Sequence, residues 1–349
     1  MRNLWEGRRR GAAARLLLAV LVPFSLGYAF IIRLRAFLFE TGLIASFSLP
    51  RPVISVGNLS VGGTGKTPMV ILLARQLIAK GKKVAVLSRG YGGPRDGEVR
   101  FVSDGSAILL PPSESADEPF LLARSVPGLI VVTGRDRYHA GRRAFERYRP
   151  DIFILDDGYQ HLRLRRDLNI LLLDAGNPFG NGWTLPAGLL REPPGAVKRA
   201  DLVIYTRSDS SLDLKKIRGI PACRSFHRLA GFVPLEGGTP APFSLLAGKP
   251  GVACAGIGNP EAFFAALVAE GLEIVSTLPF RDHCGYDRSE LAEISRVLAE
   301  TGASYLITTE KDAVKLASAG ALPAECYAAV LEIGILDPDV LERELEKLL

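Results

Sequence analysis

A glycine-rich run that ends in a lysine and a threonine carries the clearest chemistry in this sequence. Residues 62–67 are Gly-Gly-Thr-Gly-Lys-Thr, and they follow an apolar segment over residues 52–56 that is typical of a buried strand. Backbone N–H groups of such a loop, together with the N-terminus of the next helix, bind phosphate oxygens. Lys66 would neutralise charge on the β- and γ-phosphates, and the hydroxyl of Thr67 would bind Mg²⁺. The predicted nucleotide-binding residues are Gly62, Gly63, Thr64, Gly65, Lys66 and Thr67.

Two carboxylates that could hold the metal follow a second apolar run. Residues 152–155 are Ile-Phe-Ile-Leu, and Asp156 and Asp157 come directly after them. In P-loop proteins a carboxylate at the end of a neighbouring strand holds the metal, directly or through water. By itself the pair could simply open a turn before Gly158, but together with the phosphate loop it predicts a magnesium site.

Three further groups of residues are candidates for catalysis. Asp117 and Glu118 precede a proline, so they either start a helix or carry out chemistry. His161 follows closely after the carboxylate pair and is expected near the phosphates. Asp282 and His283 are adjacent: a lone histidine is usually structural, but a histidine near an acid could orient a base.

The nucleotide predicted from these residues is ATP. GTPases recognise guanine through an Asn/Thr-Lys-x-Asp run, whereas residues 308–312 are Thr-Thr-Glu-Lys-Asp and place the lysine directly before the aspartate. This spacing does not fit guanine recognition.

The elements that must position these residues form an α/β pattern. Short apolar runs alternate with helical segments, which predicts a P-loop-type parallel sheet with helices on both faces. A helix is expected over residues 68–79, directly after the phosphate loop. The strands expected in this part of the chain are residues 52–56, 83–87, 128–132, 151–155, 168–173 and 201–205.

A second, smaller α/β domain is expected after a Pro/Gly-rich junction at residues 231–251. It would contain strands at 251–257, 272–278 and 304–308, helices at 260–270 and 288–300, and a final charged helix at 338–349. The predicted division is an N-terminal helix (1–35), a kinase-like domain (36–230), the smaller domain (231–326), and a linker strand with the final helix (327–349).

The N-terminal segment has an apolar stretch flanked by arginines. Residues 16–32 are uncharged for 17 residues, the lower limit for a membrane-spanning helix. Pro23, Ser25 and Gly27 weaken that interpretation, and arginines on both sides blur the orientation signal. Arg33 and Arg35 stand where a signal peptide needs small residues. An interfacial helix on anionic lipid is favoured, with a helix packed on its own protein as the alternative.

The overall composition limits the partners. The chain has 349 residues, 48% hydrophobic content and a net charge of +6, which suits a folded two-domain protein with an acidic partner. That partner could be nucleic acid, anionic lipid or a phosphorylated substrate. No second helicase-like motif or basic stripe with interleaved aromatics accompanies the phosphate loop, which argues against nucleic acid. Four scattered cysteines argue against a zinc site or a disulfide framework.

Several motifs together resemble one family, the tetraacyldisaccharide 4′-kinases of lipid A biosynthesis. Residues 56–68, Val-Gly-Asn-Leu-Ser-Val-Gly-Gly-Thr-Gly-Lys-Thr-Pro, are similar to the phosphate loop of that family. Ser60, which stands where the general motif has a glycine, fits the family as well. The other matching runs are residues 88–92 (Ser-Arg-Gly-Tyr-Gly), 134–137 (Gly-Arg-Asp-Arg), 156–161 (Asp-Asp-Gly-Tyr-Gln-His) and 309–312 (Thr-Glu-Lys-Asp).

The resemblance implies ATP- and Mg²⁺-dependent phosphorylation of the 4′-hydroxyl of a tetraacylated glucosamine disaccharide 1-phosphate. The reaction would take place at the cytoplasmic face of a bacterial inner membrane, next to its anionic lipids, with no protein partner evident. Asp117 would be the general base, paired with His283, and Lys66 would stabilise the transferring group. The implied metal residues are Thr67, Glu118, Asp156 and Asp157. The implied cleft residues are Tyr91, Arg137, Gln160 and His161.

The resemblance also implies a two-stranded linker between the domains, for which residues 223–229 and 327–333 are the candidates. A different class of protein remains as the alternative at this point. A P-loop switch ATPase could bind a protein partner at the membrane and use hydrolysis as a timer. The two differ in whether ATP turnover needs an acylated sugar or a protein.

Overall fold

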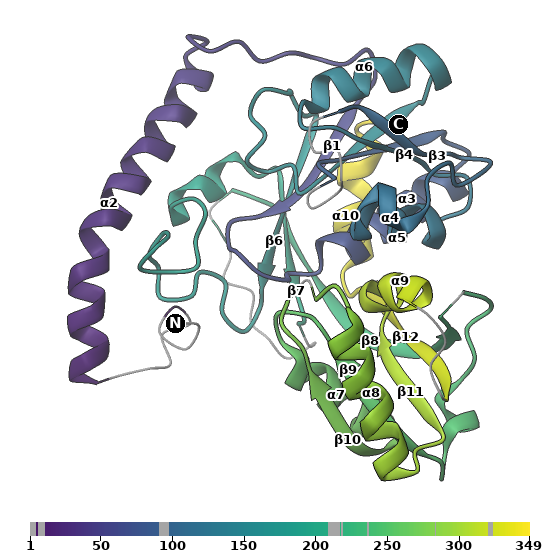
Figure 1. Cartoon of the computed structure of the whole chain (residues 1–349). Helices are drawn as coiled ribbons and strands as arrows, with labels where there is room; N and C mark the ends of the chain where they lie inside the picture. Colours follow the sequence, from purple (N-terminus) through teal and green to yellow (C-terminus); the bar gives the residue numbers. More distant parts are fainter. Residues whose placement is uncertain are drawn as a thin grey trace.

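The structure, a computed structural model, describes residues 5, 11–90, 98–208, 217, 219–235, 237–282, 284–317, the backbone of 318–319, and 324–349. One twelve-stranded sheet runs through this part of the chain, in the order β10-β9-β11-β12-β8-β7-β6-β1-β5-β2-β4-β3. Two units share it (Figure 1). The first unit comprises residues 53–206, and the second unit comprises residues 243–319.

The first unit contains the six predicted strands and one that was not predicted. Its strands are β1 (Val53–Asn58), β2 (Val84–Ser88), β3 (Arg100–Asp104), β4 (Ile130–Thr133), β5 (Ile152–Asp156), β6 (Leu168–Asp174) and β7 (Leu202–Thr206). All pair in parallel except β3, which runs antiparallel to β4 at the edge of the sheet. The parallel strands are buried over almost their whole length because helices cover both faces.

Alternate residues of the strands form two cores on opposite faces. Ile54 and Val56 face α3 (Lys66–Ala79), α5 (Asp117–Ser125) and the C-terminal α10 (Pro338–Glu346). Val53 and Phe153 face α6 (Arg137–Tyr148) on the other side. The predicted α/β class with helices on both faces is confirmed. The short elements α4 (Pro112–Ser115) and η1 (Pro194–Arg199) lie between strands.

The second unit repeats the pattern on a smaller scale. Its strands are β9 (Pro250–Ala255), β10 (Glu273–Pro279) and β11 (Tyr305–Thr309), and all three are parallel. The helices are η2 (Phe243–Leu246), α7 (Pro260–Ala269), α8 (Arg288–Thr301) and α9 (Glu310–Ala319). The Thr-Glu-Lys-Asp run therefore marks the end of β11 and the start of α9, a helix that was not predicted.

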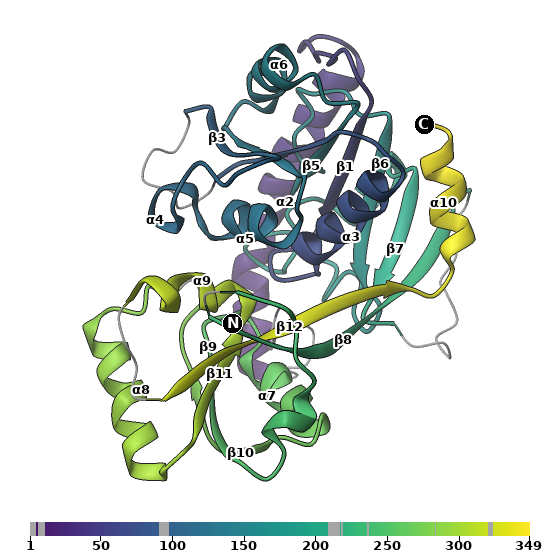
Figure 2. The same ribbon diagram turned by 90° about the vertical axis from the view of Figure 1, so that its right-hand side faces the viewer.

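Two long strands join the units. β8 (Ala222–Pro234) and β12 (Glu325–Ile335) pair antiparallel along their length, and β8 also pairs in parallel with β7 (Figure 2). Residues 223–229 and 327–333, predicted as linker strands, lie within this pair. The expected boundary at residues 230/231 falls inside β8, so no loop separates the units there. After β12 the chain returns to the first unit, where α10 buries Leu341 and Leu345 in its core.

The N-terminal segment forms one continuous helix, α2 (Ala12–Glu40), of 29 residues with Pro23 inside it. Ser25 is fully buried and fixes the helix to the first unit. Its hydroxyl donates to the carbonyl of Thr184 at 2.8 Å and accepts from the N–H of Ala187 at 2.9 Å. The polar residue that argued against a spanning helix therefore docks α2 on its own protein.

The opposite face of α2 is apolar and exposed. Leu16, Phe24 and Phe30 are 65–70% exposed, and the other exposed apolar residues of the helix include Val20, Leu26, Ile31, Leu34 and Phe37. By length and composition α2 could cross a membrane, since its best window has a mean hydropathy of 2.1. The helix thus has one face packed on protein and one face suited to lipid, a combination that neither alternative alone describes.

Candidate active site

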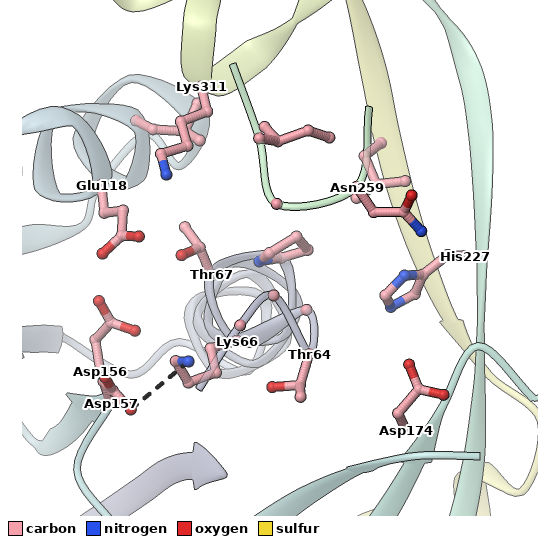
Figure 3. Close-up of a pocket in the computed structure, with 18 of the residues that line it drawn as sticks. Thr64, Lys66, Thr67, Glu118, Asp156, Asp157, Asp174, His227, Asn259 and Lys311 are labelled. Carbon is pink, nitrogen blue, oxygen red and sulfur yellow. Dashed lines mark ion pairs between the residues drawn. The ribbon is translucent and has the colours of Figure 1, made fainter. Parts of the chain in front are cut away.

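A cleft of about 1880 Å³ lies between the two units and collects most of the predicted site residues. The carboxyl ends of β2, β5 and β6 reach it from the first unit, at the edge of a parallel sheet where ligands usually bind. The second unit contributes the start of α7 and the start of α9, and β8 forms part of the wall. Figure 3 shows the phosphate loop in the middle, with Glu118, Asp156 and Asp157 on one side. His227, Asn259 and Asp174 lie on the other side.

The phosphate loop has the conformation that its glycines permit. Gly62 and Gly65 have φ angles of 118° and 80°, in the left-handed region that favours glycine. A Cβ on Gly65 would also lie 2.6 Å from the ring of His227 on β8. Lys66 begins α3, so the loop leads directly into a helix N-terminus as phosphate binding requires.

Asn58, the last residue of β1, organises this loop from beneath. It is fully buried. Its side-chain amide donates to Thr64 Oγ1 at 2.9 Å, and its Oδ1 accepts from Lys66 Nζ at 3.4 Å. Asn58 thereby fixes the side chains of Thr64 and Lys66 relative to each other. This role was not predicted from the sequence, although a polar residue at the end of an apolar strand was a usable signal.

Asp156 and Asp157 stand at the end of β5, in contact with residues from three other segments. Lys66 Nζ lies 3.7 Å from Asp157 Oδ1, and Arg191 donates to Asp157 Oδ2 at 2.8 Å (Figure 3 shows the lysine pair). Ser88, at the end of β2, donates to Asp156 Oδ2 at 3.2 Å. The alternative of a simple turn does not account for these contacts.

Burial and nearby charges shift the pKa values of the two aspartates in opposite directions. Burial, followed by the nearby charges of Glu118 and Asp157, raises the pKa of Asp156 to about 7. Burial also acts to raise the pKa of Asp157, but Lys66 and Arg191 outweigh burial and lower it. Asp157 therefore carries a charge at neutral pH, whereas the positive charge of Lys66 compensates Asp156 only in part.

Asp117 and Glu118 open α5 and both line the cleft. The N-cap position belongs to Ala116, whose φ of 65° is strained for a residue with a side chain, and no side chain caps the helix. Asp117 is instead paired with Lys315 of α9, Nζ to Oδ2 at 2.9 Å. Asp117 and Glu118 thus do start a helix, as first-turn residues, but Asp117 does not cap it.

Arg137, Gln160 and His161 line the cleft together with the carboxylates. Arg137 is 6% exposed at the start of α6, and the side-chain amide of Gln160 donates to the carbonyl of Asn58 at 2.9 Å. Burial, followed by the charge of Arg137, lowers the pKa of His161 to about 4, so its imidazole is neutral at neutral pH. Buried atoms without a hydrogen-bond partner here include Gln160 Oε1, His161 Nε2 and Arg137 Nε.

Tyr91 and His283 lie outside the described residues. Asp282 is described: it lines the cleft and pairs with Lys311, Nζ to Oδ1 at 3.6 Å. Besides that of Asn58, the roles of Arg191 and Lys315, which contact predicted site residues, were not predicted from the sequence. Neither residue belongs to a recognisable sequence motif, because each contacts its partner only through the tertiary fold.

The residues present fit a magnesium ion held together with nucleotide phosphates. Thr67, Glu118, Asp156 and Asp157 offer oxygen ligands in one cleft, and Asp157 Oδ1 is buried without a hydrogen-bond partner. Within the described part of the chain, no three His, Cys, Asp or Glu side chains form a ready metal cage. Mg²⁺ commonly uses one or two carboxylates plus phosphate oxygens and water, so an incomplete protein shell suits it.

The raised pKa of Asp156 predicts a stability effect without nucleotide or metal. Between pH 3.8 and about 7 the folded state holds more protons at this group than the unfolded state. The contribution of Asp156 to the free energy of unfolding should therefore fall as pH rises through this interval, whereas the lowered pKa of His161 contributes in the opposite direction. Asp156→Asn removes this slope and should raise Tm at about pH 8 by a few degrees, where ~1 kcal/mol corresponds to about 2–4 °C.

Thermal unfolding in chelator at about pH 5 and about pH 8 measures this effect for the wild type and the variant. Asp339→Asn, at an exposed position of α10, is the control and should keep the wild-type pH slope. An Asp156→Asn protein that loses stability equally at both pH values would contradict the assignment of a buried charge that is compensated only in part.

Comparison with known proteins places this chain among kinases. The family model described as tetraacyldisaccharide-1-P 4′-kinase matches residues 17–349. A tetraacyldisaccharide 4′-kinase from Geobacter sulfurreducens is 56% identical over 100% of this chain and 98% of its own length. One from Geobacter metallireducens is 54% identical over 96% of this chain and 99% of its own length.

A solved structure agrees with the sequence relatives. The crystal structure of LpxK from Aquifex aeolicus in complex with ATP superposes with a TM-score of 0.81 at 33% identity, over 95% of this chain and 99% of that one. The match extends across both units and the joining strands. The chain belongs to the tetraacyldisaccharide-1-P 4′-kinase family.

Proposed function

We propose that this protein transfers the γ-phosphoryl group of ATP to the 4′-hydroxyl of a tetraacylated glucosamine disaccharide 1-phosphate, with Mg²⁺ as cofactor. The observation that carries the proposal is a phosphate loop that faces Glu118, Asp156 and Asp157 across one cleft, in a chain that belongs to this kinase family. Family membership favours this lipid kinase over a P-loop switch ATPase that acts on a protein partner.

Phosphoryl transfer needs positioning and charge neutralisation more than covalent chemistry. The loop amides and Lys66 hold the β- and γ-phosphates, and Asn58 keeps Lys66 in place. Thr67, Glu118, Asp156 and Asp157 are the residues that would hold Mg²⁺. A magnesium ion held by these residues would supply positive charge that offsets the charge of the transferring group.

Asp117 is the proposed general base for the sugar hydroxyl. A hydroxyl is a weak nucleophile at neutral pH, so a carboxylate within hydrogen-bond reach accelerates its attack. Asp117 lines the cleft next to Glu118, one of the proposed metal residues, which supports this role. His283 is the proposed partner of Asp117, and its neighbours Asp282 and Cys284 belong to the second unit.

An acylated, phosphorylated acceptor explains the rest of the cleft. Arginines line its wall near Gln160 and His161, and they suit the 1-phosphate of the acceptor: Arg35, Arg89, Arg137, Arg163 and Arg191. Tyr28 and Ile32 of α2 line the same cleft. One helix therefore borders the sugar site and also presents the exposed apolar face on which acyl chains and membrane lipids can pack.

The proposed location is the cytoplasmic face of the bacterial inner membrane, where α2 holds the protein through its apolar face. Anionic lipids would contact the flanking arginines. No protein partner or nucleic acid is required for the reaction.

Lys66→Ala should reduce phosphoryl transfer at least about 10²-fold, because it removes a positive charge that stabilises the transition state. The assay combines labelled ATP with the lipid disaccharide, with thin-layer separation of the product. Matched reactions with a deacylated disaccharide or without acceptor distinguish a lipid kinase from an ATPase. A wild-type protein that hydrolyses ATP equally with and without lipid would refute the proposed function, and an active Lys66→Ala protein would refute the role of Lys66.

A triple variant of α2, Phe24→Gln with Phe30→Gln and Leu34→Gln, should weaken binding to vesicles of anionic lipid several-fold. These side chains lie on the exposed face, so Ser25 keeps the helix docked. Flotation with the vesicles measures the effect. Leu245→Gln with Val268→Gln, two exposed apolar residues of the second unit, is the control. Equal flotation of the triple variant and the wild type would place the membrane contact elsewhere.

A further inference from the structure

Lys315 of the second unit contacts the proposed base of the first unit. α5 and α9 pack against each other at the cleft, and Lys315 Nζ lies 2.9 Å from Asp117 Oδ2. The two side chains are only 15% and 23% exposed, so solvent screens this ion pair less than a surface pair. It is a direct charge contact between the two units at a residue assigned to chemistry.

The same ammonium group also holds the loop that leads out of β10. Lys315 Nζ donates to the carbonyl oxygen of Cys284 at 2.8 Å. Cys284 is 1% exposed, and its own N–H donates to the carbonyl of Arg281, so this loop is anchored in the second unit. Lys315 therefore joins Asp117 to the chain directly after position 283.

A second lysine of α9 reaches the same loop from one turn earlier. Lys311 pairs with Asp282, Nζ to Oδ1 at 3.6 Å, and residues four apart lie on one side of a helix. The two lysines contact the residues directly before and after position 283. Lys311 lines the cleft, where Figure 3 shows its side chain on the same side as Glu118, whereas Lys315 is not among the lining residues.

Lys315 thus engages Asp117 at one carboxylate oxygen without being part of the cleft wall. The ion pair is formed at Oδ2 of Asp117. A carboxylate that must accept a proton from a bound hydroxyl gains from being held in one orientation, because its oxygen has to lie within about 3 Å of the donor. A purely structural pair between α5 and α9 would not need to involve this residue.

We propose that Lys315 is a positioning residue for phosphoryl transfer, which orients Asp117 and ties it to the loop around position 283 of the second unit. The proposal rests on the proposed function and deepens it. Lys315 contacts neither nucleotide nor sugar in this assignment. It acts through Asp117, so its removal should slow the chemical step and leave nucleotide binding intact.

The test compares Lys315→Met with Lys315→Arg in the lipid kinase assay. Lys315→Met should lower kcat about 10–100-fold, the range expected when a reacting group is misplaced, with KM for ATP within about twofold of wild type. Lys315→Arg keeps the charge and should recover a substantial part of kcat. Lys347→Met, which removes an exposed lysine paired with Glu344 on α10, is the matched control and should retain full activity.

A double-mutant cycle shows whether Lys315 acts through Asp117. In an Asp117→Asn background the added Lys315→Met should cost less than about twofold, because the group that it positions is already disabled. Tm and the affinity for Mg·ATP establish that each variant is folded, and Lys315→Gln replaces any Lys315→Met protein that is not.

Two results would overturn the inference: wild-type kcat in Lys315→Met, or the full loss of activity again in the Asp117→Asn background. Neither result affects the proposed function, which fails only when the wild-type protein does not phosphorylate the lipid.

Discussion

The burial of negative charge beside the phosphate loop is the constraint on which the rest of this structure depends. Asp156 is 3% exposed next to Asp157 and Glu118, and Lys66 with Arg191 compensates only part of that charge. The local backbone is strained as well, since Asp157 and Ala116 have φ angles of 50° and 65°. Such an arrangement lowers stability, and its natural explanation is a divalent cation and phosphate groups that complete it on binding.

The continuous sheet explains how two units can share one site. β8 and β12 run from one unit into the other, and α10 then packs back on the first core, so the joint consists of paired strands with no flexible loop. β8 also carries His227, whose ring lies against Gly65 of the phosphate loop. The packing of the phosphate loop is therefore linked directly to the strand about which the units would move, and nucleotide binding can bias their relative position.

Much of this arrangement was predictable from local patterns. Gly62, Gly65 and Lys66 have fixed spacing, and apolar runs locate most of the strands, because backbone conformation and burial on both faces act on neighbouring residues. β3 escaped prediction since an edge strand carries few apolar residues. The roles of Lys315 and Arg191 were not predicted because contacts between residues far apart in sequence leave no local signal. The protein-packed face and the exposed face of α2 could not be told apart from the sequence either. Ser25 only appears to weaken an apolar helix until its hydrogen bond to Thr184 is known.

The central claim is that the buried carboxylates bind magnesium with ATP, and proton release on binding tests it most directly. Asp156, with a pKa of about 7, is partly protonated in the free protein and has to lose that proton to face a cation. Titration calorimetry of Mg·ATP near pH 7, in buffers of different ionisation enthalpy, should show net proton release for the wild type and none for Asp156→Asn. Equal proton release from both proteins would contradict the account.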